Sequence, residues 1–286
     1  GVQTCALPIW KPSLKELLIE LNKIEDLSWI RIMYTYPSLL SDDLLETINK
    51  LDKVVKYIDV PLQHVSKHML EAMNRPVMDN KKLIKRIRKM IPNVAIRTTF
   101  ITGYPTETEE DFKELYDFIK EMKIDRLGVF EFSREKNTKA DKLKPQITAK
   151  VKKQRRKQLM TLQKSIAEEL NKKSAGKNIE CIVEAIDEKG DIVARTYKDA
   201  PEVDCLMYIN TTTPVNPGDI VTAKITGAVE YDLIGNGIEN DRDICLYSMS
   251  PIFDRILKWI DLKIEKDMKK EFNYTNYDLP KFVMFS

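Results

Sequence analysis

The order of apolar segments predicts an α/β protein, in which a partial (β/α) barrel of about four parallel strands is followed by a small antiparallel β-barrel. Two observations support this fold class. Up to about residue 132, short apolar strands alternate with amphipathic helices, the order typical of parallel sheets with helical crossovers. From residue 176 to residue 236 the apolar period changes from helical to alternating, and turn residues recur at close spacing.

The first part of the chain predicts strands separated by helices. A capping box at Ser13-x-x-Glu16 begins a helix that extends to Ile24, and a second box at Thr106-x-x-Glu109 begins a helix that ends near Met122. Other helices are expected to start near residues 42, 66 and 80. Apolar runs bounded by Pro, Gly or Asn predict the strands, at residues 29–34, 55–60, 94–101 and 127–132. A complete barrel needs more strands than these, so we expect an open sheet.

The second part of the chain predicts a basic helix and then short strands. Lysine and arginine greatly outnumber acids between residues 142 and 177, where apolar residues keep a helical stripe. Such a helix either binds nucleic acid or presents a solvated face. Strands are expected at residues 179–185, 192–196, 206–209, 220–225 and 229–233. The predicted organisation is a non-native leader at 1–9, a partial barrel at 10–147, a basic linker helix at 148–175, a small barrel at 176–236 and an unassigned tail at 237–286, with an amphipathic helix near residues 252–260.

The composition is typical of a folded globular chain. Hydrophobic residues make up 43% and charged residues 32%, with a formal net charge of +3. No apolar run approaches the roughly 20 residues that cross a bilayer, so we expect no membrane partner. The four cysteines are far apart and form no C-x-x-C pair, which argues against a disulfide framework and a local zinc or iron–sulfur loop. These features predict a cytoplasmic protein.

Candidate functional residues follow the predicted strands, because reactive groups in parallel α/β barrels project from the carboxyl ends of strands. Arg97 lies inside a strand, where it either binds an anion or pairs with a local acid. His64 and His68 could share one helix face as metal ligands, but no third ligand accompanies them, so no metal site is predicted. No dinucleotide, P-loop or nucleophile-elbow motif occurs.

Longer strings resemble a known family. The segments at residues 57–64, 73–76, 97–108 and 128–133 are similar to those of the radical S-adenosylmethionine (SAM) methylthiotransferases. The run from Arg195 to Asp204, which contains Asp-Ala-Pro-Glu, resembles the TRAM domain of the branch that modifies a ribosomal protein, the RimO family. The tRNA-modifying branch, the MiaB family, lacks this run. The resemblance implies a cytoplasmic transferase that adds a methylthio group to the β-carbon of an aspartate in ribosomal small-subunit protein S12.

The resemblance also implies cofactors and a site. The family uses SAM and two 4Fe-4S clusters, one of which cleaves SAM to a radical. Residues expected to line the SAM side, or merely to pack the barrel, are Gln63, His64, Arg97, Thr99, Ile101, Gly103, Phe130, Glu131, Phe132 and Ser133. Residues expected to face the protein substrate, or merely to form a turn, are Asp199, Ala200, Pro201, Glu202 and Asp204.

The family's cluster cysteines have no counterpart among Cys5, Cys181, Cys205 and Cys245. We therefore expect this chain to be a C-terminal fragment of the enzyme and to be inactive as written. Two other functions stay open. One is a tRNA methylthiotransferase. The other is a TRAM-type module that binds the ribosome or RNA, in which the basic helix contributes to RNA binding and no catalysis occurs.

Overall fold

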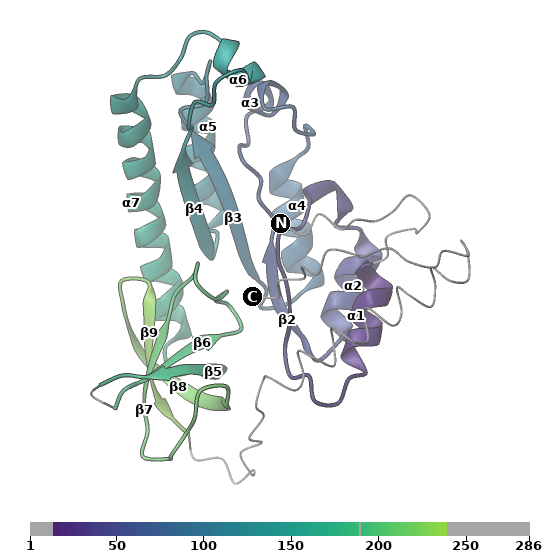
Figure 1. Cartoon of the computed structure of the whole chain (residues 1–286), viewed down its shortest axis with the longest axis vertical. Coiled ribbons are helices and arrows are strands. Elements are labelled where there is room, and N and C mark those ends of the chain that lie inside the picture. The colour runs from purple at the N-terminus through teal and green to yellow at the C-terminus, as the bar shows by residue number, and fades with distance from the viewer. Residues whose placement is uncertain (1–13, 189, 239–286) are drawn as a thin grey trace, which may run out of the picture.

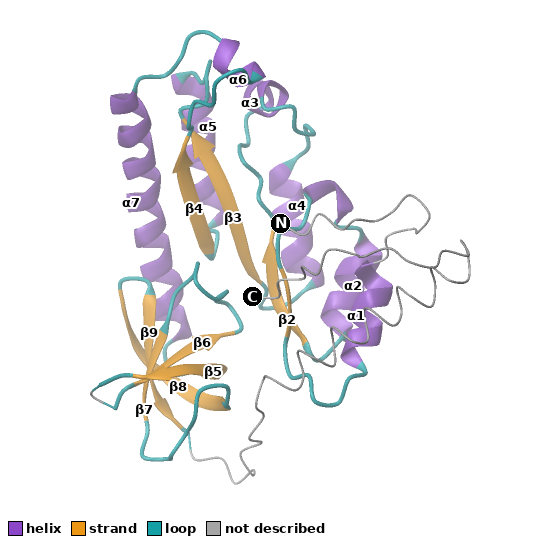
Figure 2. Cartoon of the chain, viewed as in Figure 1, coloured by secondary structure: helices purple, strands orange, loops and turns teal. Residues whose placement is uncertain are grey.

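Figure 1 shows the computed structural model of the chain, in which residues 14–188 and 190–238 are described. They form an open parallel sheet with helices on one face, a long helix along its edge and a closed small barrel (Figure 2). The predicted leader, the start of the first capping box and the predicted tail helix lie outside the described residues. No helix within the described ranges is long and apolar enough to cross a membrane.

The sheet has four strands in the order β1-β2-β3-β4, and all its pairings are parallel. This confirms the predicted partial barrel. The register aligns Asp59 with Arg97 and Thr99 with Gly128. The strands are β1 (Ile30–Ile32), β2 (Val54–Asp59), β3 (Ala95–Thr102) and β4 (Arg126–Glu131).

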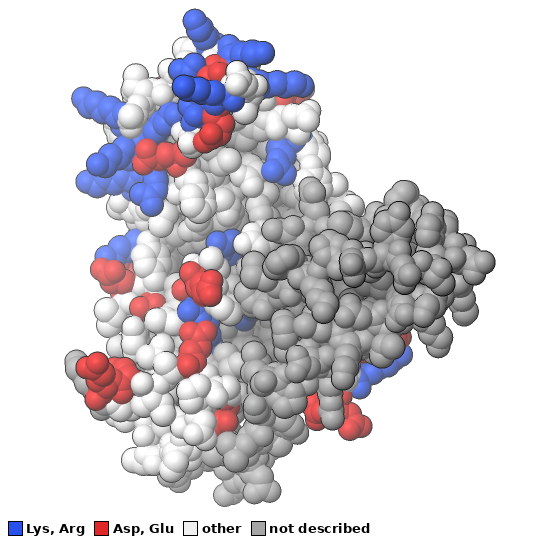
Figure 3. Space-filling model, in the orientation of Figure 1, with Lys and Arg blue, Asp and Glu red and all other residues white. Residues whose placement is uncertain are grey.

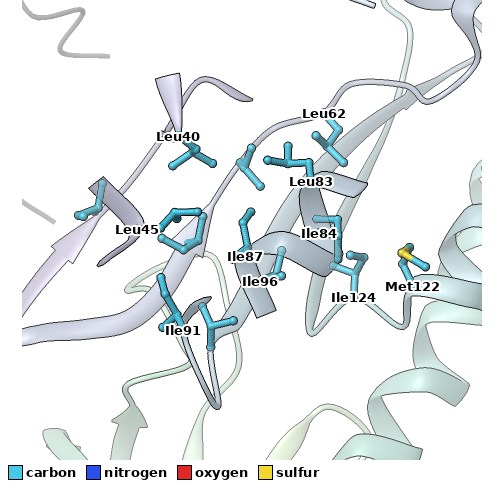
Figure 4. Close-up of a cluster of buried hydrophobic side chains, with 14 of the residues drawn as sticks. Leu40, Leu45, Leu62, Leu83, Ile84, Ile87, Ile91, Ile96, Met122 and Ile124 are labelled. Carbon is cyan, nitrogen blue, oxygen red and sulfur yellow. The ribbon is translucent and has the colours of Figure 1, made fainter. Parts of the chain in front are cut away.

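Helices cover one face of this sheet and bury the main core. Their apolar stripes interlock with the alternate side chains of the strands (Figure 4). The buried side chains labelled in that view are Leu40, Leu45, Leu62, Leu83, Ile84, Ile87, Ile91, Ile96, Met122 and Ile124. The helices of this region are α1 (Leu14–Asn22), α2 (Asp42–Lys50), α3 (Lys67–Ala72), α4 (Asn80–Met90) and α5 (Glu109–Met122), with a 3₁₀ turn η1 (Pro37–Leu39).

The capping box predicted at Thr106 is wrong by two residues. Thr108 is the N-cap of α5: its hydroxyl accepts from the Asp111 N–H, and the Asp111 carboxylate accepts from the Thr108 N–H. Thr106 instead has a positive φ of 72° and donates its N–H to the carbonyl of Pro145. The usual motif has Glu or Gln at the third helical position, whereas this helix has aspartate. A search for the usual motif therefore does not find this capping box.

The basic segment forms the helix α7 (Ala149–Ser174), preceded by the short helix α6 (Lys139–Lys142), which the sequence pattern did not predict. The predicted apolar stripe of α7 packs inward, with Leu159 and Ile166 buried. The helix contacts β4 and α5 along one half and β8 of the small barrel beyond it (Figure 1). It therefore connects the open sheet to the small barrel.

The small barrel closes in the order β5-β6-β7-β9-β8. The pairing of β7 with β9 is parallel, so the expectation of an antiparallel barrel holds for the other pairings only. A strand expected at residues 229–233 is instead a turn, at Glu230 with a φ of 54°, followed by the last strand. The strands are β5 (Asn178–Ile186), β6 (Ile192–Thr196), β7 (Met207–Asn210), β8 (Ile220–Val229) and β9 (Asp232–Gly237).

Candidate functional site

The two faces of the parallel sheet have different partners, because side chains alternate along each strand. Along β3, Ile96 and Phe100 are buried in the core beneath the helices. Arg97, Thr99 and Ile101 face the opposite side, which we call the open face. Its residues, placed by the strand register, are Tyr57, Asp59, Arg97, Thr99, Ile101, Arg126, Gly128 and Phe130.

A loop of the small barrel covers the amino-terminal half of the open face. We call residues 199–204 the docking loop. Asp204 accepts hydrogen bonds from the Tyr57 hydroxyl at 2.6 Å and from Arg97 Nε at 3.2 Å. Asp199 pairs with Arg126 at 2.6 Å, and both side chains are almost fully buried. The predicted site residues Asp199 and Asp204 therefore bind the sheet.

The residues of the Asp-Ala-Pro-Glu run differ in exposure. Ala200 is buried against Tyr57 and Val55. Pro201 is partly exposed and Glu202 is exposed. Only the tip of the docking loop therefore remains available to a partner.

The buried charges of this contact stabilise one another. Burial alone would lower the pKa of Arg97, but Asp59 and Asp204 raise it further than burial lowers it. Burial and the neighbouring Asp204 raise the pKa of Tyr57, so the phenol stays protonated and donates. Burial raises the pKa of Asp59, against hydrogen bonds from the Tyr34 N–H and from Arg97. Arg97 therefore pairs with two local acids, and its expected role in ligand binding stays a prediction.

The carboxyl-terminal half of the open face carries no docking loop. Thr99, Gly128 and Phe130 lie together there: a Cβ added at Gly128 would be 3.4 Å from the Phe130 ring and 3.7 Å from Thr99 Oγ1. Phe130 is 58% exposed, although it follows a buried strand residue. An exposed aromatic ring beside a hydroxyl and a bare backbone can contact a flat apolar ring together with polar groups.

Backbone groups form the edge of this half. Gln63 has a φ of 67°; its N–H donates to the Thr99 carbonyl, and its carbonyl accepts from Ile101. Gly103 has a φ of 73° and donates its N–H to Glu107 at 2.7 Å. The structure therefore brings Gln63, Thr99, Ile101, Gly103 and Phe130 to one edge of the sheet.

His64 does not join the open face. It is fully buried, its Nε2 lies 3.3 Å from Glu107, and its Nδ1 accepts from the Ser66 N–H. Glu107 also pairs with Arg155 of α7, whose side chain is 5% exposed. The imidazole therefore helps to hold the loop after β3 and is not placed to contact a ligand on the open face.

The remaining predicted residues continue past β4. Phe132 packs edge-on against Tyr104 with ring centroids 4.9 Å apart, and its carbonyl accepts from Lys152 Nζ at 2.7 Å. Glu131 and Ser133 are exposed, and the Ser133 hydroxyl donates to Glu135. These residues form the rim of the site and not its floor.

The described cysteines do not suit an iron–sulfur cluster. Cys181 and Cys205 lie in or beside the small barrel, and burial raises the pKa of each thiol to about 12. Clusters are held by thiolates, which these protonated thiols are not. Within residues 14–188 and 190–238, no group of three or more His, Cys, Asp or Glu is arranged to hold a metal ion.

Several residues of the site escaped the sequence pattern. From the sequence, Tyr57 and Arg126 are indistinguishable from other strand residues. Arg155 is likewise one of many charged residues in a basic helix. Glu107 lies in the family-like segment at residues 97–108, but the sequence assigned it no role. Their partners lie far along the chain, so no local signal could identify these contacts.

Two family models match the chain. A model of the radical SAM superfamily matches residues 5–119, and a TRAM domain model matches residues 175–238. The chain therefore combines a radical SAM sheet with a TRAM domain. Among solved structures, coproporphyrinogen III oxidase (HemN) from Escherichia coli aligns with 73% of this chain and 51% of its own, with 13% identity and a TM-score of 0.42.

Curated relatives identify the family. The ribosomal protein uS12 methylthiotransferase RimO of Caldanaerobacter subterraneus is 46% identical over 79% of this chain and 52% of its own length. The RimO protein of Clostridioides difficile is 44% identical over 79% of this chain and 51% of its own length. The chain belongs to this family of radical SAM methylthiotransferases, and it spans about half the length of the curated relatives it matches.

Proposed function

We propose that this chain carries the cofactor-binding sheet and the TRAM domain of a cytoplasmic enzyme that adds a methylthio group to the β-carbon of an aspartate in ribosomal protein uS12. The similarity to RimO proteins over most of the chain carries this proposal. The open face supports it, because Thr99, Gly128 and the exposed Phe130 ring lie together at the edge where parallel barrels hold their reactants.

SAM would lie on the carboxyl-terminal half of the open face. There it would supply the radical and the methyl group of the reaction. Phe130 would pack against its flat adenine ring, and Thr99 would offer a hydroxyl. The Gln63 and Gly103 segments hold the backbone at this edge in left-handed conformations, which fixes the wall of the site.

The 4Fe-4S clusters of the family need thiolates that this chain does not supply at a matching spacing. We therefore expect the chain alone to bind no cluster and to perform no turnover. Its own contribution is to bind and orient SAM and to hold the TRAM domain against the sheet through Asp199 and Asp204.

The exposed tip of the docking loop is the proposed contact with uS12. Glu202 has a φ of 64°, and Val203 is 49% exposed. Because Asp199 and Asp204 hold both ends of the loop, the tip is presented rigidly. RNA is a second proposed partner, through the basic helix α7 and the TRAM domain.

A chimera tests this function without depending on the missing thiolates. The part of the Caldanaerobacter relative that matches this chain is replaced by residues 14–238, and the product is loaded with iron and sulfide and then given SAM, sulfide and the one-electron reductant dithionite. We expect it to methylthiolate a peptide of uS12 that contains the target aspartate, as read by mass spectrometry. A chimera that folds, binds clusters and leaves the peptide unmodified would contradict the proposal.

Transfer to tRNA is the second candidate, because the basic α7 surface would suit an RNA substrate. The same chimera is offered tRNA in place of the peptide. Methylthiolated tRNA with an unmodified peptide would replace the first proposal by the second.

A further inference from the structure

Exposed lysines without acidic partners gather at the end of the molecule where the cofactor edge lies. Figure 3 shows lysine and arginine side chains around α6 and the beginning of α7. We call the exposed lysines of this segment the lysine patch. Its members are Lys136, Lys139, Lys142, Lys144, Lys150, Lys153 and Lys157.

Within the described ranges, many exposed lysines pair with an acid, whereas those of the lysine patch, like a few elsewhere, do not. Elsewhere exposed lysines commonly contact an acid, as Lys81 does with Glu121 and Lys113 with Asp117. Within the described ranges, no lysine of the patch forms such a pair. Asp141, which lies among them, is paired with Arg134. The patch therefore carries a net positive charge, although Glu135 and Asp141 lie within the same segment.

The basic side chains on the two sides of α7 have different surroundings. Lys152 and Arg155 point inward, where Lys152 binds the Phe132 carbonyl and Arg155 binds Glu107. Lys150, Lys153 and Lys157 recur at helical spacing on the exposed side, along about 10 Å of helix. The positive end of the α7 dipole adds to their potential. Several phosphates in a row could be neutralised along this stripe.

The lysine patch is anchored to the cofactor edge. The segment between α6 and α7 binds the loop after β3, because the Pro145 carbonyl accepts from the Thr106 N–H at 2.9 Å. Lys152 also lies over the Phe132 ring, with Nζ 4.9 Å from its centroid. A polyanion on the patch would therefore lie beside the mouth of the site.

An anionic membrane fits this surface less well than RNA. Interfacial helices insert an apolar face. Among the described residues, the large exposed hydrophobic side chains do not include any from residue 131 to residue 157. The surface offers charge alone, which suits a phosphate backbone.

We propose that the lysine patch binds RNA beside the catalytic edge, and that the substrate is accordingly a ribosomal protein in its RNA-bound form. The second clause rests on the proposed function. A free RNA-binding protein is itself basic as a class, so the patch would repel it, whereas RNA around the same protein would attract the patch. The patch thus selects the assembled particle over the free protein.

The test compares two variants of equal charge change. The patch variant is Lys150→Gln/Lys153→Gln/Lys157→Gln. The matched control is Lys82→Gln/Lys89→Gln/Lys120→Gln, three exposed lysines on α4 and α5, away from α7 and the TRAM domain. Binding of a fluorescein-labelled RNA stem-loop is followed by anisotropy between about 50 and 200 mM salt.

We expect the patch variant to bind the stem-loop about tenfold more weakly at ~0.1 M salt, with a salt slope smaller by about two to three. The control should match the parent chain. Equal weakening of both variants, no weakening of the patch variant, or tighter binding to phosphatidylglycerol vesicles than to RNA would overturn the proposal.

A second measurement addresses the particle. Small ribosomal subunits are pelleted with each variant, and free uS12 is offered in parallel. The parent and the control should pellet with subunits and bind free uS12 weakly, and the patch variant should lose the pelleting. Tighter binding to free uS12 would overturn the second clause. These assays need neither SAM nor clusters, whereas the chimera assay uses a peptide without RNA, so each proposal can fail alone.

Discussion

The contact between Tyr57 and Asp204 should contribute measurably to the docking of the TRAM domain. The Tyr57 side chain is fully buried, Asp204 is 5% exposed, and the hydroxyl donates to Oδ2 at 2.6 Å. A hydrogen bond to a charged acceptor contributes about 1.5–3 kcal/mol. In Tyr57→Phe this bond is lost, while Asp204 keeps Arg97 and the Ala200 N–H as donors.

The double-mutant cycle of Tyr57→Phe with Asp204→Asn measures how much of this bond depends on the charge of Asp204. An amide oxygen still accepts but carries no charge, and Arg97 keeps Asp59 as its partner, so the variant avoids an unpaired buried cation. We expect each single variant to lower the free energy of unfolding by about 1–3 kcal/mol, with a coupling energy of about 1–2 kcal/mol.

The assay is urea unfolding followed by the fluorescence of Trp29, which packs beside Tyr57 and Tyr197 at the docking contact. The other tryptophans, Trp10 and Trp259, are replaced by phenylalanine in every variant. Tyr208→Phe, at a tyrosine 39% exposed on the small barrel, is the control and should change stability by less than about 0.5 kcal/mol. A coupling energy below about 0.5 kcal/mol would refute the reasoning.

Three further predictions concern the loop after β3. Gly103→Ala should cost about 1–3 kcal/mol more in urea unfolding than Gly176→Ala, since both glycines have positive φ but only at Gly103 would a Cβ collide with Lys152; equal costs would show that the space is open. Arg155→Met should cost about 3–5 kcal/mol because it leaves the buried Glu107 carboxylate without its cation, and Arg155→Met/Glu107→Gln should recover part of that loss; an additive double variant would contradict this. Burial would raise the pKa of Asp111, but hydrogen bonds from Ser66, Thr108 and His68 lower it to about 2, below the ordinary value of 3.8. A carboxyl with a lowered pKa stabilises the fold above its ordinary pKa and loses that effect as pH falls through the folded value, so the stability difference between the parent and Asp111→Asn should shrink between about pH 4 and pH 2. A difference that is constant over that range would count against it.

Sequence patterns predicted what depends on neighbours along the chain. Strand β3 and helix α2 follow from runs such as Leu44, Leu45 and Ile48, which recur at a period that only one face can bury. The long basic helix was equally clear, because its apolar stripe persists through Leu159 and Ile166. The parallel pairing of β7 with β9 was not predictable, because the two strands are separated in sequence by β8 and pair only when the barrel closes.

The candidate site was only partly predictable, for the same reason. The resemblance brought out Thr99, Ile101 and Phe130, which lie on the open face, and alternation along a strand accounts for their common side. It also grouped His64 with them, although His64 is buried and contacts Glu107 in the loop after β3. Likewise, Asp199 and Asp204 were expected at a substrate surface because their partners Arg126 and Arg97 lie elsewhere in the sequence.

The central claim is that the carboxyl-terminal half of the open face binds SAM. Amide and methyl NMR spectra of the labelled chain, titrated with SAM, test it most directly. We predict that signals of Thr99, Ile101 and Gly128 shift together and that Gly128→Val abolishes the shifts, whereas Gly227→Val, at a glycine with open space around it, preserves them. Shifts confined to other residues, or shifts that survive in Gly128→Val, would contradict the claim.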